Sequence, residues 1–152
     1  MTDEIDTDSI EGALAQINFG PDGLVASVAQ QFDTGEVLMV AWMNRDAVRL
    51  TLAEGRVCYW SRSRRALWRK GESSGQIQRL REMRLDCDGD TVLLLVDQTG
   101  VACHTGRRSC FYRAWRGGDA NGGDAGWTTI AEPEIPPEQL YPARDPGLDR
   151  PD

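Results

Sequence analysis

The distribution of proline and glycine limits where this chain can build a folded core. Six of its seven prolines lie between Pro133 and Pro151, and residues 117–126 read GGDANGGDAG. Sequences of this kind form flexible linkers and extended tails that bury little apolar surface. Truncation after Arg116 should therefore leave the activity of the protein largely intact. We predict an acidic N-terminal segment at 1–19, one globular domain at 20–116 and a Gly/Pro-rich acidic tail at 117–152.

The charge of the chain is unevenly distributed. Asp and Glu number 24 against 17 Lys and Arg, which gives a formal net charge of -7. This balance makes nucleic acids and anionic membranes poor partners. Residues 56–84, in contrast, carry nine basic side chains and only two acids, Glu72 and Glu82. We therefore expect a basic site between two acidic ends.

The sequence predicts neither a targeting segment nor a membrane-spanning segment. Its first 20 residues are acidic and lack the basic and apolar regions of a signal peptide. The longest apolar run, Val37–Met43, has seven residues, whereas a helix that spans a bilayer needs about 20. We expect a cytoplasmic protein with four reduced cysteines, which favours metal binding or catalysis over disulfides.

Strand patterns dominate the predicted domain. Two apolar segments, 24–30 and 36–43, flank the turn-forming Asp33-Thr34-Gly35, and the second is apolar enough to be a buried strand. Asp88-Gly89 favours a tight hairpin because both positions tolerate positive φ. Further strands are expected at 56–60, 77–85, 91–96, 101–103 and 110–115, with a polar, basic loop at 61–75.

One principal helix is expected at about residues 44–54. Asn44 offers a side-chain oxygen to the free amides at its start, and Gly55 supplies the left-handed residue that ends it. Val48 and Leu52 lie on one face of this helix. The predicted fold class is therefore α+β and strand-rich, a compact domain with a mixed or antiparallel sheet.

Three cysteines and the only histidine are candidates for chemistry. Cys87, Cys103 and Cys110 could hold zinc and leave a fourth position for water, which is typical of catalytic zinc sites. Their spacing also fits buried cysteines that act as small hydrophobes, the interpretation favoured for Cys58. Histidine ordinarily titrates near neutral pH, so His104 could move protons beside a metal-bound water. The alternative is an exposed or structural histidine.

Two polar clusters are candidates for binding cations and phosphates. The aspartates of DCDGD at 86–90 repel one another unless solvent or a cation such as magnesium screens them, and a solvated hairpin turn is the alternative. The loop SRSRRALWRKGESSG combines guanidinium groups, hydroxyls and glycines, which suit the binding of phosphate. The alternative is a solvated basic loop without a ligand. The candidate substrate-binding residues are Arg62, Arg64, Lys70, Ser73, Ser74 and Gly75.

Several stretches together resemble one family. SRSRRALWRKGESSG, RLDCDGDTVLLLVDQTG and ACHTGRRSCFYR, with EVLMVAWMNRDAV upstream, closely resemble the monofunctional phosphoribosyl-AMP cyclohydrolases of histidine biosynthesis. The resemblance covers about residues 20–116 and neither acidic end. It implies a hydrolase that opens the N1–C6 bond of 1-(5-phosphoribosyl)-AMP. The product would be formimino-aminoimidazole carboxamide ribotide, in the third step of L-histidine biosynthesis.

The resemblance also implies roles for individual residues. Cys87 from one subunit would join Cys103 and Cys110 from the other to bind one zinc per subunit in an intertwined homodimer. Zinc would activate the attacking water, and His104 matches a histidine implicated in catalysis. The family's magnesium ligands match Asp86, Asp88 and Asp90.

Two further functions fit some of the same residues. A zinc-dependent nucleotide deaminase would also attack C6 of adenine, but its H-x-E and P-C-x-x-C signature is missing, since Thr105-Gly106 follows His104. A zinc-stabilised module could instead bind single-stranded RNA through the basic loop and its neighbouring aromatic residues. Such binding would depend strongly on salt and would survive loss of His104. The aromatic residues in question are Tyr59, Trp60 and Trp68.

Overall fold

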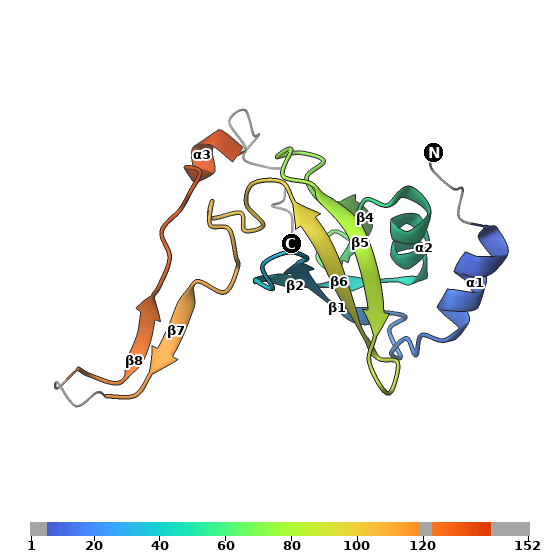
Figure 1. The fold of residues 1–152 in the computed structure, drawn as a ribbon, viewed down its shortest axis with the longest axis horizontal. Coiled ribbons are helices and arrows are strands. Elements are labelled where there is room, and N and C mark those ends of the chain that lie inside the picture. The colour runs from blue at the N-terminus through green and yellow to red at the C-terminus, as the bar shows by residue number, and fades with distance from the viewer. Residues whose placement is uncertain (1–5, 119–122, 141–152) are drawn as a thin grey trace.

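A four-stranded mixed sheet forms the centre of the computed structural model, which describes residues 6–118 and 123–140 (Figure 1). The strand order is β2-β1-β6-β5. β1 pairs parallel with β6 and antiparallel with β2, while β5 pairs antiparallel with β6. This arrangement confirms the predicted strand-rich α+β class and its mixed sheet. The strands are β1 (Val25–Gln31), β2 (Val37–Met43), β5 (Gln78–Leu85) and β6 (Thr91–Gln98).

Alternating side chains explain why β1 and β6 form the middle of the sheet. Every second residue of each strand is buried, beginning with Val25 in β1 and Val92 in β6. A period of two sends these side chains to one face, where the apolar ones join the main core. The predicted hairpin is confirmed, since β5 and β6 pair antiparallel and residues 86–90 connect them. Among these five residues only Gly89 has a positive φ, +77°, so the expectation of positive φ at both Asp88 and Gly89 is correct for the glycine alone.

The predicted helix is α2 (Arg45–Glu54), and both of its ends form as expected. The Asn44 side chain accepts a hydrogen bond from the Ala47 amide at 2.8 Å. Gly55 ends the helix in the left-handed region, at a φ of +70°. Val48 is fully buried against the core.

A second helix, α1 (Thr7–Ala15), lies in the segment that we expected to be only an acidic end. Ile10 and Leu14 are one turn apart and are buried in the same core cluster as the sheet, and α1 packs against α2. The acids of α1 remain exposed. The predicted boundary at residue 20 therefore leaves out a helix that covers the core. Within the described residues, no helix has the length and apolar character required to cross a bilayer.

A small antiparallel sheet of β3 (Cys58–Ser61) and β4 (Ala66–Arg69) lies beside the main one. β4 falls inside the predicted basic loop. It forms because Trp68 pairs with Tyr59 across the two strands, with ring centroids 5.5 Å apart and both side chains buried. The strand predicted at 101–103 is absent, since Val101 has no regular structure and Ala102 and Cys103 form a bend.

The C-terminal part forms more structure than the tail that we predicted. β7 (Arg113–Arg116) and β8 (Gly126–Thr129) form a hairpin that extends away from the main sheet (Figure 1). Trp115 and Trp127 are opposite each other in this hairpin and are 59% and 72% exposed. The short helix α3 (Pro137–Leu140) follows and ends with the buried Leu140.

Candidate active site

The segment between β6 and β7 brings two of the three candidate zinc ligands together. The Cys103 amide donates to the Arg107 carbonyl at 3.1 Å, and Gly106 turns the chain with a φ of +85°. The Cys110 amide then donates to the Leu38 carbonyl of β2 at 2.7 Å. These backbone contacts bring the two thiols close enough to influence each other's ionisation.

The two thiols differ in their readiness to ionise. The hydrogen bond with Cys110 lowers the pKa of the Cys103 thiol, and the Thr105 hydroxyl, which donates to this sulfur at 3.0 Å, acts in the same direction. The same hydrogen bond raises the pKa of Cys110. The pair therefore holds one negative charge more readily than an isolated cysteine does. A thiolate beside a second thiol is a donor set that suits a soft, thiophilic ion such as zinc.

The third candidate ligand lies apart from this pair. Cys87 is exposed in the loop between β5 and β6. In the part of the chain that the structure describes, the only cluster of three or more possible metal ligands is formed by aspartates, not by cysteines. One chain therefore does not assemble a three-thiol site. Cys58 is fully buried in β3, as expected for a cysteine that packs as a small hydrophobe.

The aspartate cluster occupies the turn between β5 and β6. Ligand atoms of Asp86, Asp88 and Asp90 lie within 4.8 Å of one another, and all three residues are exposed. Hydrogen bonds with Asp88 and Asp86 raise the pKa of Asp90. Asn18 supports the turn by donating from its side chain to the Asp88 carbonyl at 2.6 Å. Converging carboxylates of this kind suit a hard cation such as magnesium.

His104 and the arginines of the basic loop are accessible to a ligand. His104 is exposed in the turn directly after Cys103. The guanidinium of Arg62 lies 4.9 Å from the Trp42 ring and lines a cavity of about 370 Å³ together with Trp60 and Arg65. The structure thus adds Arg65 to the predicted set at this cavity.

The remaining predicted substrate contacts lie along the same loop and the turn after β4. Arg64 is partly buried, and its Nε has no hydrogen-bond partner within the described residues. Ser73 and Gly75 are exposed, while the Ser74 hydroxyl accepts from the Gln76 amide at 3.2 Å.

Lys70 occupies a different environment from the rest of the predicted set. It is only 4% exposed, and its Nζ donates to the Ala102 carbonyl at 2.8 Å. Burial lowers the pKa of Lys70 to about 8, and the nearby Cys110 and Cys103 thiols oppose that shift. The sequence predicts an open basic loop at Lys70. Instead, Lys70 follows directly after β4, and the pairing of β3 with β4 leaves its side chain buried beside the thiols.

Residues 101–110, which carry Cys103 and Cys110, form the cysteine loop. A buried polar network that the sequence did not reveal supports this loop. The Tyr59 hydroxyl donates to the Gln78 side chain at 2.6 Å, and Gln78 donates to the Gln98 side chain at 2.8 Å. Gln98 in turn donates to the Val101 carbonyl at 3.4 Å. Glutamine is ordinarily exposed, so only the three-dimensional arrangement identifies Gln78 and Gln98 as interior residues.

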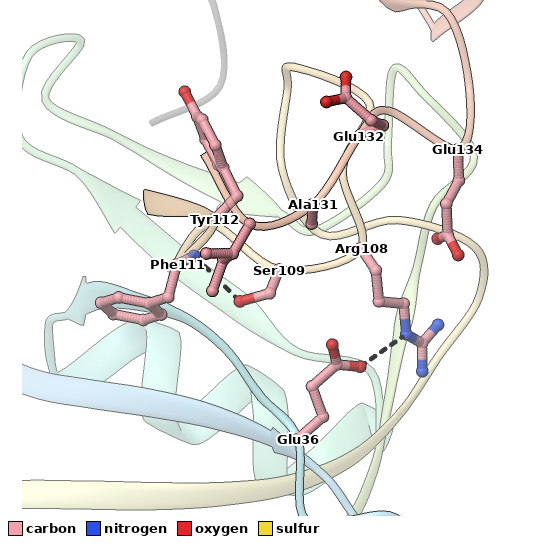
Figure 2. Close-up of a pocket in the computed structure, with 9 residues that line it drawn as sticks. Glu36, Arg108, Ser109, Phe111, Tyr112, Ala131, Glu132 and Glu134 are labelled. Atoms are coloured by element: carbon pink, nitrogen blue, oxygen red, sulfur yellow. Dashed lines mark hydrogen bonds and ion pairs between the residues drawn. The ribbon is translucent and has the colours of Figure 1, made fainter. Parts of the chain in front are cut away.

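The C-terminal segment at 130–135 packs against the loop that carries Cys103 and His104. The Glu134 amide donates to the Gly106 carbonyl at 2.9 Å, and the Arg107 Nε donates to the Ala131 carbonyl at 2.8 Å. A Cβ at Gly106 would overlap the Ile135 carbonyl oxygen. Figure 2 shows the cavity of about 460 Å³ that lies between residues 108–112 and this segment. The tail is therefore part of the surroundings of the candidate site, contrary to our expectation of a detached linker.

Comparison with known proteins identifies the relatives of this chain. The family model for phosphoribosyl-AMP cyclohydrolase matches residues 39–112. A phosphoribosyl-AMP cyclohydrolase of Rhodospirillum centenum is 64% identical over 132 residues, which is 87% of this chain and 94% of the relative. The one from Granulibacter bethesdensis is 65% identical over 82% of this chain and 93% of the relative. The chain belongs to the phosphoribosyl-AMP cyclohydrolase family.

This assignment confirms the resemblance predicted from the sequence and the expectation of a hydrolase. All candidate metal ligands and His104 fall within the segment 39–112 that the family model matches. The matches to these cyclohydrolases cover more of the chain than residues 20–116 contain. At least one flanking segment is therefore shared with the relatives, in agreement with the packing of α1 and of residues 130–135.

Proposed function

We propose that this chain opens the adenine ring of 1-(5-phosphoribosyl)-AMP by hydrolysis of the N1–C6 bond, the third step of L-histidine biosynthesis. The observation that carries the proposal is the pair of thiols, Cys103 and Cys110, beside an exposed His104 in the segment matched by the family. In this substrate, the phosphoribosyl group on N1 makes the ring electrophilic at C6. An enzyme of amino-acid biosynthesis is expected in the cytoplasm.

Cys103 and Cys110 would hold a zinc ion together with Cys87 from a second subunit. A zinc ion held by these three thiolates would supply activation of the attacking water, because zinc lowers the pKa of bound water toward about 7. His104 would take the proton from the attacking water and deliver a proton to the departing nitrogen N1. Its exposure next to a ligand cysteine supports this role, because a substrate can reach it.

The two phosphates of the substrate would be bound by the basic loop and by magnesium. Arg62 borders a cavity in which Trp60 offers an aromatic face. Arg64, Ser73, Ser74 and Gly75 would supply further donors, and the aspartates of the turn between β5 and β6 would hold the magnesium ion.

The active form would be a homodimer with two shared zinc sites. The separation of Cys87 from the thiol pair within one chain supports this arrangement. The β7–β8 hairpin supports it as well, because exposed tryptophans on a projecting arm are typical of a contact with another chain. We propose that residues 20–116 carry the catalytic residues, and that α1 and residues 130–135 complete the fold around them.

The assay that tests the function compares substrates. Purified full-length protein should open the ring of phosphoribosyl-AMP, followed by absorbance, and should release no ammonia from AMP. Ammonia release without ring opening would identify a deaminase. Salt-sensitive binding of single-stranded RNA with no turnover of either nucleotide would identify a binding module instead.

A further inference from the structure

Lys70 is a buried cation that the proposed reaction does not use. Its side chain lies at the end of β4, 4% exposed, with Nζ 2.8 Å from the Ala102 carbonyl and 5.4 Å from the centre of the Trp68 ring. Its backbone is also fixed, because its amide donates to the Val57 carbonyl at 3.0 Å. Gly71 then turns away with a φ of +85°, at a point where a Cβ would meet the backbone of Gln76 at 2.6 Å.

The surroundings of this ammonium contain little that compensates its charge. A buried ammonium is costly unless a negative group pairs with it. None of the ion pairs formed within residues 6–118 and 123–140 includes Lys70, and the Ala102 carbonyl is a neutral acceptor. The Ala102 carbonyl that accepts the hydrogen bond from Lys70 belongs to the residue directly before Cys103, so the ammonium lies beside the thiol pair. These thiols, once ionised, are therefore its available countercharge.

We propose that Lys70 is a positioning residue for the thiol pair: it holds the carbonyl of Ala102, the residue before Cys103, and compensates the negative charge of the thiolates. The inference rests on the proposed zinc site. Three thiolates exceed the charge of a divalent ion by one, and the Lys70 ammonium restores neutrality. This role differs from the phosphate contact predicted from the sequence, because the ammonium is directed toward the cysteine loop and not toward solvent.

The test compares two full-length variants that each lose one cation from neighbouring positions. Lys70→Met removes the ammonium but keeps an unbranched apolar side chain that suits a buried site. Arg69→Met is the matched control, since Arg69 pairs with Glu54 on the surface and makes no contact with the cysteine loop that the structure records. Both proteins are purified with zinc, and melting temperatures are recorded so that any loss of folding is visible.

Two measurements that need no substrate decide the outcome. Zinc release to a chromogenic chelator should be about 10- to 100-fold faster in Lys70→Met than in the parent, and unchanged in Arg69→Met. In zinc-free protein, the rate at which the thiols are alkylated at one fixed pH should differ from that of the parent in Lys70→Met alone, because the loop before Cys103 has lost its contact with Lys70. A Lys70→Met protein that matches the parent in both measurements would overturn the proposal.

A second variant covers the case in which Lys70→Met does not fold. Lys70→Gln keeps a side-chain N–H group but removes the charge, and it should show the same two changes. Parental behaviour of Lys70→Gln would overturn the role of the charge. If the parent itself holds no zinc, the proposed zinc mechanism fails, whereas the alkylation rate of the thiols at a fixed pH still tests Lys70.

Discussion

The division of the proposed zinc site between two subunits makes a quantitative prediction. Cys87 and the thiol pair do not meet within one chain, so Cys87→Ala and Cys103→Ala should each inactivate both sites of a dimer. A heterodimer of these two variants has one site with all three native cysteines and one site that lacks two of them. Random pairing makes about half of the dimers heterodimers, so an equal mixture should recover about a quarter of the parental activity.

The assay is ring opening of phosphoribosyl-AMP by the two variants, unfolded and refolded together so that their subunits exchange. The matched control mixes Cys103→Ala with Cys110→Ala. At each site the same subunit supplies both of these cysteines. No heterodimer therefore contains a complete site, and activity should stay at the background. The shared site would be refuted if heterodimers form but the first mixture remains inactive, or if the control mixture regains activity.

Three further predictions follow from the site and from the fold. His104→Ala should lower kcat by about 100-fold with unchanged zinc content, and an unaltered rate across pH would remove His104 from proton transfer. Truncation after Arg116, which composition alone predicts to be harmless, should instead lower kcat by about tenfold, because the Gly106 carbonyl loses its contacts with residues 134 and 135; an unchanged kcat would show that this segment is dispensable. Asn44→Ala should lower the free energy of unfolding in urea by about 1 kcal/mol, because the Ala47 amide loses its cap, and an unchanged midpoint would contradict the capping role.

The parts of the fold that could be predicted are those specified by local patterns. The strands β1, β2 and β6 follow from short apolar or alternating segments bounded by turn residues. The helix α2 follows from its capping residues, Asn44 and Gly55. The cysteines, the aspartates and His104 could be named as candidates from the sequence, because thiol, carboxylate and imidazole groups can bind metals or move protons.

The parts that could not be predicted depend on contacts between distant segments. β4 forms because Trp68 pairs with Tyr59, and the same pairing buries Lys70, a residue type that is ordinarily exposed. The helix α1 was predictable in part, because Ile10 and Leu14 are spaced for one helical face. The acidic residues around them instead led to the interpretation of this segment as an acidic end. The docking of residues 130–135 on Gly106 uses backbone groups, so side-chain composition could not reveal it.

The most direct test of the account is ring opening of phosphoribosyl-AMP by the purified full-length chain before and after removal of zinc with a chelator. We predict that turnover disappears with zinc, returns when zinc is added back, and is not restored by magnesium alone. Full turnover by protein verified to contain no zinc would contradict the zinc mechanism, and no turnover by zinc-loaded protein would contradict the proposed function.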